Sequence, residues 1–403
     1  MKRIQKPIQG AFLLLAAFLL AACDGVNSPS DPTSYSEPQP QKVDFTLTEF
    51  EGEVEIHTDL QKDYFAAEDS EAWINEHSGT MGRKSASAPA PVTFAWDAVV
   101  DNGWVPDHYT VEVSKSQDFA GARTAILPNE SITLKNLQMT NFEIGVQYYW
   151  RVKAEFLNVE QVFVSEAKTF TIADDAARNL DIEGVENFRD CGGWKVEGGR
   201  IKQGLLYRSA EFNGNEKGVS APTEKGLKVL RDELGIKADL DVRRTLAANN
   251  NDEVIGITSS PLGEDIDYVS LPMVFGGSNI YSKSENKASI KAFFEYLADE
   301  THYPAVFHCV RGTDRTGALA YVIGALCGMS GEQLIQDYLF SNFANIGSTL
   351  TLNQFDGESF YHRQIAKMEG ETLSEKAENY LLAKANVGHE TVEAIRRILV
   401  EKD

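Results

Sequence analysis

The stretch YPAVFHCVRGTDRTGALAYVIGAL, residues 303–326, decides the fold of the second half of the chain. A short apolar run ends at Cys309, a polar loop follows, and a longer apolar stretch begins at Thr316. Short apolar runs predict buried strands and longer periodic ones predict helices, so the order is strand, loop, helix. Gly312 in the loop permits backbone angles that other residues resist. Successive backbone N–H groups can then face one concavity at the helix N-terminus, which predicts a site for a tetrahedral oxyanion.

The alternation of strands and helices extends over residues 174–403. GIKADLDV and YPAVFHC read as short buried strands, whereas SIKAFFEYLADE, TGALAYVIGALCG and ETVEAIRRILVEK have helical periodicity. This order predicts an α/β domain with a central sheet flanked by helices.

Residues 89–173 follow a different pattern. VTFAWDAV, YTVEVSKS and YYWRVKAEF alternate apolar and polar residues at period two and are bounded by turn residues. The stretch resembles a fibronectin type III module, with Trp96 in the place of the early core tryptophan and Tyr148 in the tyrosine-corner region. The resemblance implies a β-sandwich that serves as a spacer or as a surface for a protein partner. The fold class is therefore multidomain, a β-sandwich followed by the α/β domain.

Residues 43–88 alternate weakly and then become polar, and they read equally as linker or as a small β element. Residues 23–42 are rich in Pro, Ser and polar residues, which predicts an extended, disordered tether.

Residues 1–22 have the order of an export signal. A basic start with Lys2, Arg3 and Lys6 precedes an apolar stretch that is short for a membrane span. The ending Leu-Ala-Ala-Cys resembles a bacterial lipobox, which implies that Cys23 is acylated. We then expect a lipoprotein anchored in a bilayer of the cell envelope, on its periplasmic or cell-surface side. An ordinary signal peptide with an accidental Cys is the alternative.

Charge and cysteine usage exclude other classes. The formal charge of −22 becomes −25 once the three positive charges of residues 1–22 are removed, and this argues against nucleic-acid binding. Cys191, Cys309 and Cys327 are an odd number without metal-ligand spacing, which argues against a disulfide framework. We expect neither a metal nor a cofactor.

The residues around the loop have the chemistry of a nucleophilic site. Cys309 and Arg315 are separated by five residues, so both can face the anion cradle. Backbone donors, a helix N-terminus and a guanidinium favour the thiolate, with pKa values of about 3.5–7.5 in such settings. Arg315 can hold two phosphate oxygens, and the Thr316 hydroxyl can donate to the sulfur as it leaves. His308 is expected to order the loop backbone.

The motif Cys309-x5-Arg315-Thr-Gly resembles the phosphate loop of the Cys-dependent protein tyrosine phosphatases. The wider pattern His-Cys-x-x-Gly-x-Asp-Arg-Thr-Gly resembles the bacterial tyrosine/serine phosphatases, which have dual-specificity and phosphoinositide relatives. NFRDCGGW (residues 187–194), GRIKQGLLYRSA (199–210) and GIKADLDVRR resemble further stretches of that family. The resemblance implies a phosphate-binding loop made of Val310, Arg311, Gly312, Thr313, Asp314 and Arg315. It also implies supporting roles for Asn187, Arg189 and Asp190, besides His308.

Phosphate-ester cleavage needs a general acid, and two carboxylates compete for that role. Asp241 ends a predicted strand, and strand ends feed catalytic loops in α/β sheets. Asp314 lies inside the loop, a position used as acid in myotubularin-like relatives. We favour Asp241 and keep Asp314 as the alternative; each could instead be structural, through an ion pair with Arg243 or as a helix cap. Asp190 is a third candidate that reads better as a turn residue.

The predicted function is hydrolysis of phosphotyrosine, with phosphoserine and phosphothreonine as further substrates, through a phosphocysteine. An inositol phosphate or phosphoinositide substrate is an alternative: Thr313 replaces a Lys that relatives link with that activity, although Arg311 adds positive charge. An inactive binding lipoprotein is a second alternative, opposed by the complete set of Cys309, Arg315 and Thr316. The Arg-Thr-Gly ending counts against a rhodanese-like sulfur transferase. Cys191, which replaces the usual Leu, is either a packing change or a resolving thiol.

Overall fold

The computed structural model describes residues 39–174, 177–214, 220–243, 257–274, 280–356 and 361–403. The predicted export signal, the predicted acylation site Cys23 and nearly all of the predicted tether lie outside these residues. Within the described ranges, no helix has both the length and the apolar composition that crossing a membrane would require.

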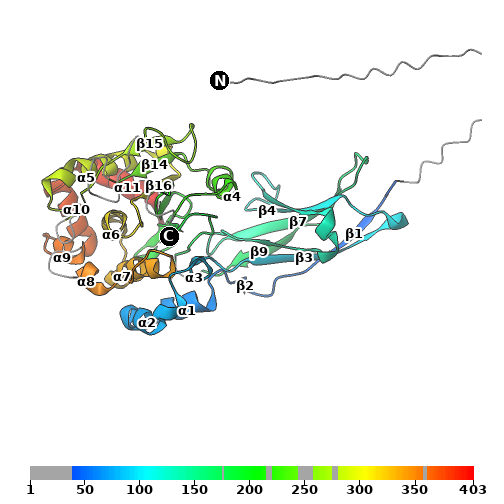
Figure 1. Ribbon diagram of the computed structural model, residues 1–403, viewed down its shortest axis with the longest axis horizontal. Coiled ribbons are helices and arrows are strands. Elements are labelled where there is room, and N and C mark those ends of the chain that lie inside the picture. Colours follow the sequence, from blue (N-terminus) through cyan, green and yellow to red (C-terminus); the bar gives the residue numbers. More distant parts are fainter. Residues whose placement is uncertain (1–38, 175–176, 215–219, 244–256, 275–279, 357–360) are drawn as a thin grey trace, which may run out of the picture. The chain divides into compact units, whose positions relative to one another are not determined.

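The N-terminal half is dominated by strands, which we call the β module (Figure 1). They form two sheets, one in the order β1-β3-β6 and one in the order β2-β9-β7-β4-β5 with β8 paired to β7. Short helical turns follow β3 and β5, namely η2 (Asp101–Gly103) and η3 (Asn129–Leu134). The strands are β1 (Val43–Leu47), β2 (Glu53–Val54), β3 (Val92–Val100), β4 (His108–Ser114), β5 (Arg123–Pro128), β6 (Asn136–Met139), β7 (Gln147–Glu155), β8 (Phe163–Val164) and β9 (Lys168–Ile172).

The predicted alternation of β3 is visible as alternating burial. Phe94 and Trp96 point into the core while Thr93 and Asp97 are exposed, because successive residues of a strand face opposite sides. Phe94 joins Trp150 and Phe170 from the other sheet, so both sheets share one aromatic core.

The C-terminal half is an α/β region with a five-stranded sheet in the order β10-β13-β16-β14-β15. The last four strands are parallel, and β10 runs antiparallel to β13. A small second sheet has the order β11-β12-β17. The strands are β10 (Arg189–Asp190), β11 (Lys195–Val196), β12 (Gly199–Ile201), β13 (Leu206–Ser209), β14 (Ala238–Asp241), β15 (Asp267–Ser270), β16 (Ala305–His308) and β17 (Val400–Lys402). The helices and helical turns are α4 (Glu224–Lys228), η4 (Val229–Glu233), α5 (Ser284–Leu297), η6 (Glu300–His302), α6 (Arg315–Leu326), α7 (Gly331–Phe340), η7 (Ser341–Phe343), α8 (Leu352–Asp356), α9 (Tyr361–Ala366), α10 (Leu373–Ala383) and α11 (His389–Leu399).

Both faces of the central sheet are covered. Ala305 and Phe307 of β16 pack into the large core shared with α5, α6 and α7, whereas Val306 packs into a second core with Leu230 of η4. Because the strands are parallel and in register, His308 lies beside Asp241 on one side and Ser209 on the other. The residues that follow β13, β14 and β16 therefore meet at one edge of the sheet, where α/β proteins place their sites.

Residues 43–88, for which the sequence left two alternatives, divide between the two halves. β1 pairs with β3 and β2 pairs with β9, so both strands belong to the β module. The helices α1 (Asp59–Phe65), α2 (Ser70–His77), η1 (Ser78–Thr80) and α3 (Lys84–Ser87) follow. Tyr64 and Ile74 are fully buried in the core of the α/β region, and the Tyr64 hydroxyl donates to the Gln336 carbonyl (2.8 Å). Part of the α/β core thus comes from a segment that lies between β2 and β3 of the β module.

The C-terminal tail differs from its prediction as one helix. Helix α11 ends at Leu399, and Val400–Lys402 instead pairs with β12. The backbone of β12 offers an edge for pairing, which helical periodicity in the tail could not indicate.

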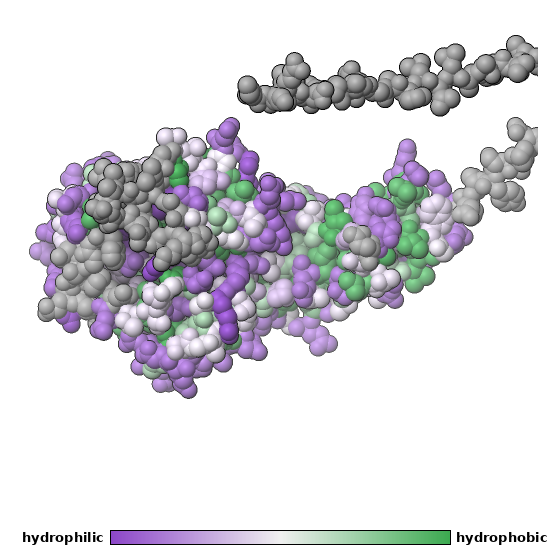
Figure 2. All heavy atoms as spheres, in the orientation of Figure 1, coloured by the Kyte–Doolittle hydropathy of each residue, from purple (hydrophilic) through white to green (hydrophobic). Residues whose placement is uncertain are grey.

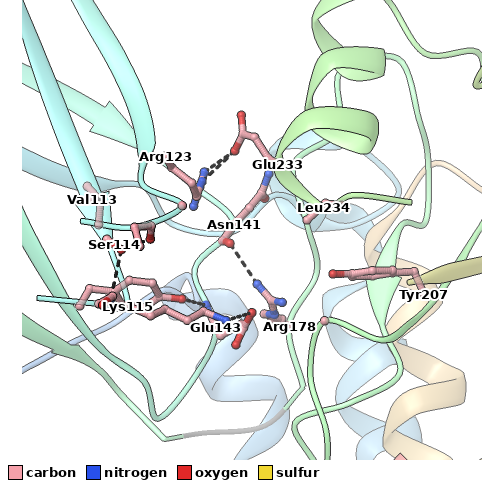
Figure 3. Close-up of a pocket in the computed structure, with 15 residues that line it drawn as sticks. Val113, Ser114, Lys115, Arg123, Asn141, Glu143, Arg178, Tyr207, Glu233 and Leu234 are labelled. Atoms are coloured by element: carbon pink, nitrogen blue, oxygen red, sulfur yellow. Dashed lines mark hydrogen bonds and ion pairs between the residues drawn. The ribbon is translucent and has the colours of Figure 1, made fainter. Parts of the chain in front are cut away.

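The two halves meet through polar contacts. Arg123 of β5 forms an ion pair with Glu233 of η4 (2.6 Å), and Arg178 donates to the Asn141 carbonyl (3.0 Å). A cavity of about 450 Å³ lies between the halves, and Lys115 and Tyr207 are among its lining residues (Figure 3). Ion pairs across such a polar interface fix its register more than they add stability.

Candidate active site

The loop after β16 has a backbone that only glycine permits at its centre. Gly312 has φ +71°, and a Cβ there would lie 2.4 Å from the Ser209 carbonyl oxygen. The loop therefore packs directly on the chain that leaves β13, and any side chain at residue 312 would push it outward.

The carbonyl groups of this loop are held from behind. Asn187 Nδ2 donates to the Arg311 carbonyl (2.9 Å), and Arg208 Nη2 donates to the Gly312 carbonyl (2.8 Å). No hydrogen bond within the described ranges uses the backbone N–H groups of Val310, Gly312, Thr313 or Asp314. Buried backbone N–H groups need hydrogen-bond partners. N–H donors that no hydrogen bond of the described chain uses, located at the start of α6, can together bind one anion.

Cys309 follows the last residue of β16 and is 2% exposed. Burial alone would raise the pKa of its thiol, but the Arg315 guanidinium and the hydroxyl and backbone N–H of Thr316 outweigh burial and lower that pKa. The Thr316 hydroxyl is fully buried with no oxygen or nitrogen partner in the described chain, which leaves it available to the sulfur. These contacts therefore stabilise the thiolate of a nucleophile that sits beside the anion cradle.

Arg315 is the first residue of α6 and is 4% exposed. Its Nη1 lies 3.5 Å from the Met273 carbonyl, a long contact at the limit of a hydrogen bond. The guanidinium and Cys309 are close enough to shift the thiol pKa, as the five-residue spacing predicts.

Asp314 lies in the loop immediately before α6. Burial raises the pKa of its carboxyl group despite the Thr313 hydroxyl, which donates to it (3.2 Å), and the neighbouring Arg315. Its side chain does not cap the helix, and its carbonyl accepts from the Tyr361 hydroxyl (2.8 Å). The hydrogen bond to its carbonyl therefore fixes the backbone of Asp314 in the loop, and its raised pKa favours the protonated carboxyl group.

Asp241, the sequence-based choice for the general acid, has the opposite environment. It accepts from the Arg243 backbone N–H (2.9 Å) and side chain (2.7 Å from Nη2) and from the Tyr268 hydroxyl (3.0 Å). Burial opposes ionisation, but His308 and Arg243 lower the pKa of Asp241 to about 2. Its donors hold an ionised carboxylate, as expected of the structural ion pair with Arg243, so we propose Asp314 rather than Asp241 as the general acid.

His308 is fully buried under the loop. Its Nδ1 lies 3.1 Å from the Cys309 carbonyl, and its Nε2 lies 3.0 Å from Asp239 Oδ1, close enough for an ion pair although not aligned as a hydrogen bond. Burial lowers the pKa of His308, but Asp241 and Asp239 reverse this and raise it. A protonated ring can donate to the Cys309 carbonyl, which fits the expected role in ordering the loop.

The supporting residues from NFRDCGGW divide into two groups. Asn187 reaches the loop, and Arg189 donates to its Oδ1 (2.5 Å), so both act on the phosphate loop. Asp190 instead accepts from Arg178 (2.9 Å) and from the Gly192 N–H (2.8 Å). Asp190 ends strand β10 and does not lie in the turn that the sequence suggested, and its carboxylate belongs to a separate buried ion pair with Arg178.

Two residues that sequence reasoning missed complete the support. Asp337 of α7 accepts from Arg189 Nε (3.0 Å) and from Arg208 Nη1 (2.6 Å), and Arg208 continues to the loop. The sequence did contain a signal for Arg208: a charged residue inside the apolar segment GLLYRSA is expected to be buried, and a buried arginine needs an acidic or carbonyl partner. Asp337 lies in an ordinary amphipathic helix and gave none.

The remaining cysteines are free thiols with little reactivity. Burial raises the pKa of Cys191 and raises that of Cys327 to about 12. A thiol that stays protonated is a poor nucleophile, so the packing interpretation of Cys191 is the better one.

One group of described residues has the spacing of metal ligands. Glu378, His389 and Glu393 bring their ligand atoms within 4.8 Å of one another on α10 and α11. Arg396 forms ion pairs with both glutamates (2.7 and 2.8 Å), so a cation of the protein already neutralises the group.

Comparison with known proteins identifies a family and individual proteins to which this chain is similar. Residues 180–401 match the tyrosine phosphatase family. A candidate tyrosine-protein phosphatase of Cupriavidus necator is 26% identical over 190 residues, which are 41% of this chain and 64% of that protein, so the match spans less than two thirds of this curated relative. The core catalytic domain of the PP-IP phosphatase SIW14 from S. cerevisiae, solved with citrate, is 20% identical with a TM-score of 0.29, over 41% of this chain and 90% of that one. Another structure of the Siw14 catalytic core is 18% identical with a TM-score of 0.27, over 40% of this chain and 89% of that one.

Proposed function

The chain belongs to the tyrosine phosphatase family, and from that premise we propose that it is a phosphatase that hydrolyses phosphotyrosine, with phosphoserine and phosphothreonine as further substrates, through a phosphocysteine. The observation that carries the proposal is Cys309, whose thiol has a lowered pKa and lies beside unspent backbone N–H groups at the start of α6. A nucleophile and an anion cradle in one loop are what phosphoryl transfer to sulfur requires.

In the first step, the Cys309 thiolate attacks phosphorus. The bond from sulfur to phosphorus forms, the bond from phosphorus to the ester oxygen breaks, and protonated Asp314 gives its proton to that oxygen. Arg315 and the loop N–H groups hold the equatorial oxygens, where negative charge accumulates in the transition state.

In the second step, water attacks the phosphocysteine. The Asp314 carboxylate takes a proton from the water, the phosphorus–sulfur bond breaks, and phosphate is released. The Thr316 hydroxyl stabilises the departing thiolate, since it has no oxygen or nitrogen partner in the described chain.

An inositol phosphate or phosphoinositide is the second candidate substrate. Arg311 is the exposed residue of an otherwise largely buried loop and carries a second positive charge at its rim. Such a charge would favour a substrate with another phosphate near the scissile one.

The anchor and the β module belong to the same proposal. The Leu-Ala-Ala-Cys ending supports acylation of Cys23 and a location in the cell envelope. For a fibronectin type III-like module, the support is two sheets around one core and the Tyr148 hydroxyl, which accepts from the Glu143 N–H (3.0 Å) as in a tyrosine corner.

The first experiment compares the mature chain with its Cys309→Ser variant on p-nitrophenyl phosphate. We expect turnover that resists EDTA, is inhibited by vanadate and is lost in Cys309→Ser. Competition between phosphopeptides and inositol phosphates then separates the two substrate classes. A folded parent without turnover on any of these esters would contradict the catalytic proposal and favour the inactive binding lipoprotein.

The second experiment tests the general acid with Asp314→Asn and Asp241→Asn as a matched pair. Asp314→Asn should lower kcat by about 10²–10⁴-fold on phenyl phosphate, whose leaving group needs a proton, and by less on p-nitrophenyl phosphate. Asp241→Asn should lower stability without this dependence on the leaving group. A leaving-group dependence in Asp241→Asn alone would return the role to Asp241.

A further inference from the structure

The large apolar side chains exposed on the described chain are concentrated in one half. Seven of them are between 43% and 69% exposed, and within the described ranges the α/β region contributes none. All seven belong to the β module: Val99, Val105, Ile126, Leu134, Leu157, Val162 and Val164. Single exposed apolar residues are common, but a concentration of them marks a contact surface.

Four of these residues lie at one end of the module, together with the partly buried Trp104. We call this set the tip patch: Val99, Trp104, Val105, Leu157 and Val162. They come from the end of β3, the loop before β4 and the turn between β7 and β8. The two loops are adjacent, because the Asp107 N–H donates to the Glu155 carbonyl (2.7 Å) and the Trp104 ring lies 6.4 Å from that of Phe156. Figure 2 shows apolar atoms in green over the end of the module that carries β1.

The chain enters the β module at the same end. Val43 is paired with Val100, and the Asp101 N–H donates to the Lys42 carbonyl (3.2 Å). The Asp101 carboxylate accepts from the backbone N–H groups of Gln41 (3.0 Å) and Lys42 (3.2 Å). Residues 41 and 42 are thus fastened to the loop that carries Trp104 and Val105.

We propose that the tip patch rests on the surface of a lipid bilayer. This inference depends on the proposed acylation of Cys23. The sequence from Cys23 to Pro40 can span about 60 Å at most. The end of the module where the chain enters is therefore the end that the anchor keeps near the membrane.

The composition of the patch suits this occupant. Trp has an apolar body and a polar N–H, which favours the boundary between acyl chains and water, and aliphatic residues beside it add buried apolar area. The acylated Cys23 would fix only the far end of residues 23–40, so a second contact at the tip patch would orient the β module on the bilayer.

Charges around the patch define the kind of bilayer. Exposed Asp107 and Glu160 lie on the same two loops, and the partly exposed Glu155 lies at the adjoining end of β7. Carboxylates at this depth repel anionic headgroups, so a zwitterionic surface is preferred, and salt should weaken the discrimination.

The test uses the mature chain on phosphatidylcholine vesicles with brominated acyl chains, which quench tryptophan on contact. We expect quenching that disappears in Trp104→Phe, because Trp96, Trp150 and Trp194 are at most 5% exposed. The fifth tryptophan, the partly buried Trp73, lies on α2 and packs against the core of the α/β region, away from the tip patch. Val105→Asp with Leu157→Asp should abolish quenching while the acylated chain stays bound, whereas Ile126→Asp, an exposed site on β5, should keep it. Replacing half of the lipid by phosphatidylglycerol should reduce quenching at low salt.

Mass spectrometry of Cys23 and phosphatase assays separate this inference from the proposed function. If the acylated chain binds the vesicles but its Trp104 is not quenched, the inference is overturned, and the tip patch would instead contact a protein partner. If Cys23 is unmodified, the same measurement at high lipid concentration decides, since the patch alone must then bring Trp104 to the bilayer. Absence of quenching there also overturns it, whatever the catalytic result.

Discussion

The surroundings of the phosphate loop and the β module are built on opposite principles. In the α/β region, Arg178, Arg189, Arg208 and Arg243 are among the largest fully buried side chains. In the β module, the corresponding side chains are rings such as Phe94 and Trp150. The module also carries the exposed large apolar residues of the described chain.

This difference shows what each half does with its interior. Burying rings stabilises a fold without directing any group. Buried charges stabilise little overall, but an incorrect geometry leaves them unpaired at high cost, so they fix positions. In this protein they fix the carbonyl of Gly312 and, through Asn187, that of Arg311. The candidate site is held by buried, directional ion pairs and hydrogen bonds, whereas the β module is held by apolar packing that has no preferred direction.

Breaking the buried network should have the largest effect. Asp337→Asn leaves Arg189 and Arg208 without their shared carboxylate, and we expect a loss of about 3–5 kcal/mol in the free energy of unfolding. Because Arg208 also holds the loop, the pKa of Cys309 should rise, which alkylation rates against pH would show.

The matched control is Asp265→Asn, which breaks the exposed pair with Arg231 (3.1 Å). It should change the free energy of unfolding by less than about 1 kcal/mol and leave alkylation unchanged. Equal effects of the two substitutions, measured by urea unfolding, would contradict the contrast between the two halves.

Weakening the module core should have a smaller and purely structural effect. Phe94→Leu removes ring contacts with Trp150 and Phe170 and should cost about 1–2 kcal/mol of stability. The kcat of the folded protein should stay within about twofold of the parent. A large fall in kcat at full folding would show that the module core positions the site, as the buried charges do.

The smallest expected effect is a dependence of the free energy of unfolding on pH, caused by the titration of His308. Its pKa is raised in the folded state, so its stabilisation is complete below about pH 6.5 and is lost as pH rises through the folded pKa. We expect Cys309→Ser to lose stability over this range, and Cys309→Ser with His308→Asn to lose less. The Cys309→Ser background removes the thiol, whose lowered pKa would act in the opposite direction. Parallel curves of the urea midpoint from pH 6 to pH 9 would contradict the buried ion pair.

The comparison also shows how far the sequence could be interpreted. Alternation in VTFAWDAV and periodicity in TGALAYVIGALCG gave strand β3 and helix α6 nearly to their ends, because both signals are local. The tail beyond Leu399 and residues 43–88 were not predicted, because their structure depends on partners distant in the chain: β12 for the tail, and β3, β9 and the α/β core for the segment.

For the site, spacing alone brought Cys309, Arg315 and Thr316 together, since six or seven residues of one loop cannot lie far apart. The sequence by itself was therefore enough to predict the nucleophile and the anion cradle and to indicate the phosphatase family. The choice of Asp314 over Asp241 as the proposed acid, and the contacts of Asp337, depend on the tertiary structure. The reason is physical: whether a carboxyl group keeps a proton or holds a charge depends on its burial and on the arginines around it, and these come from strands and helices far apart in the chain.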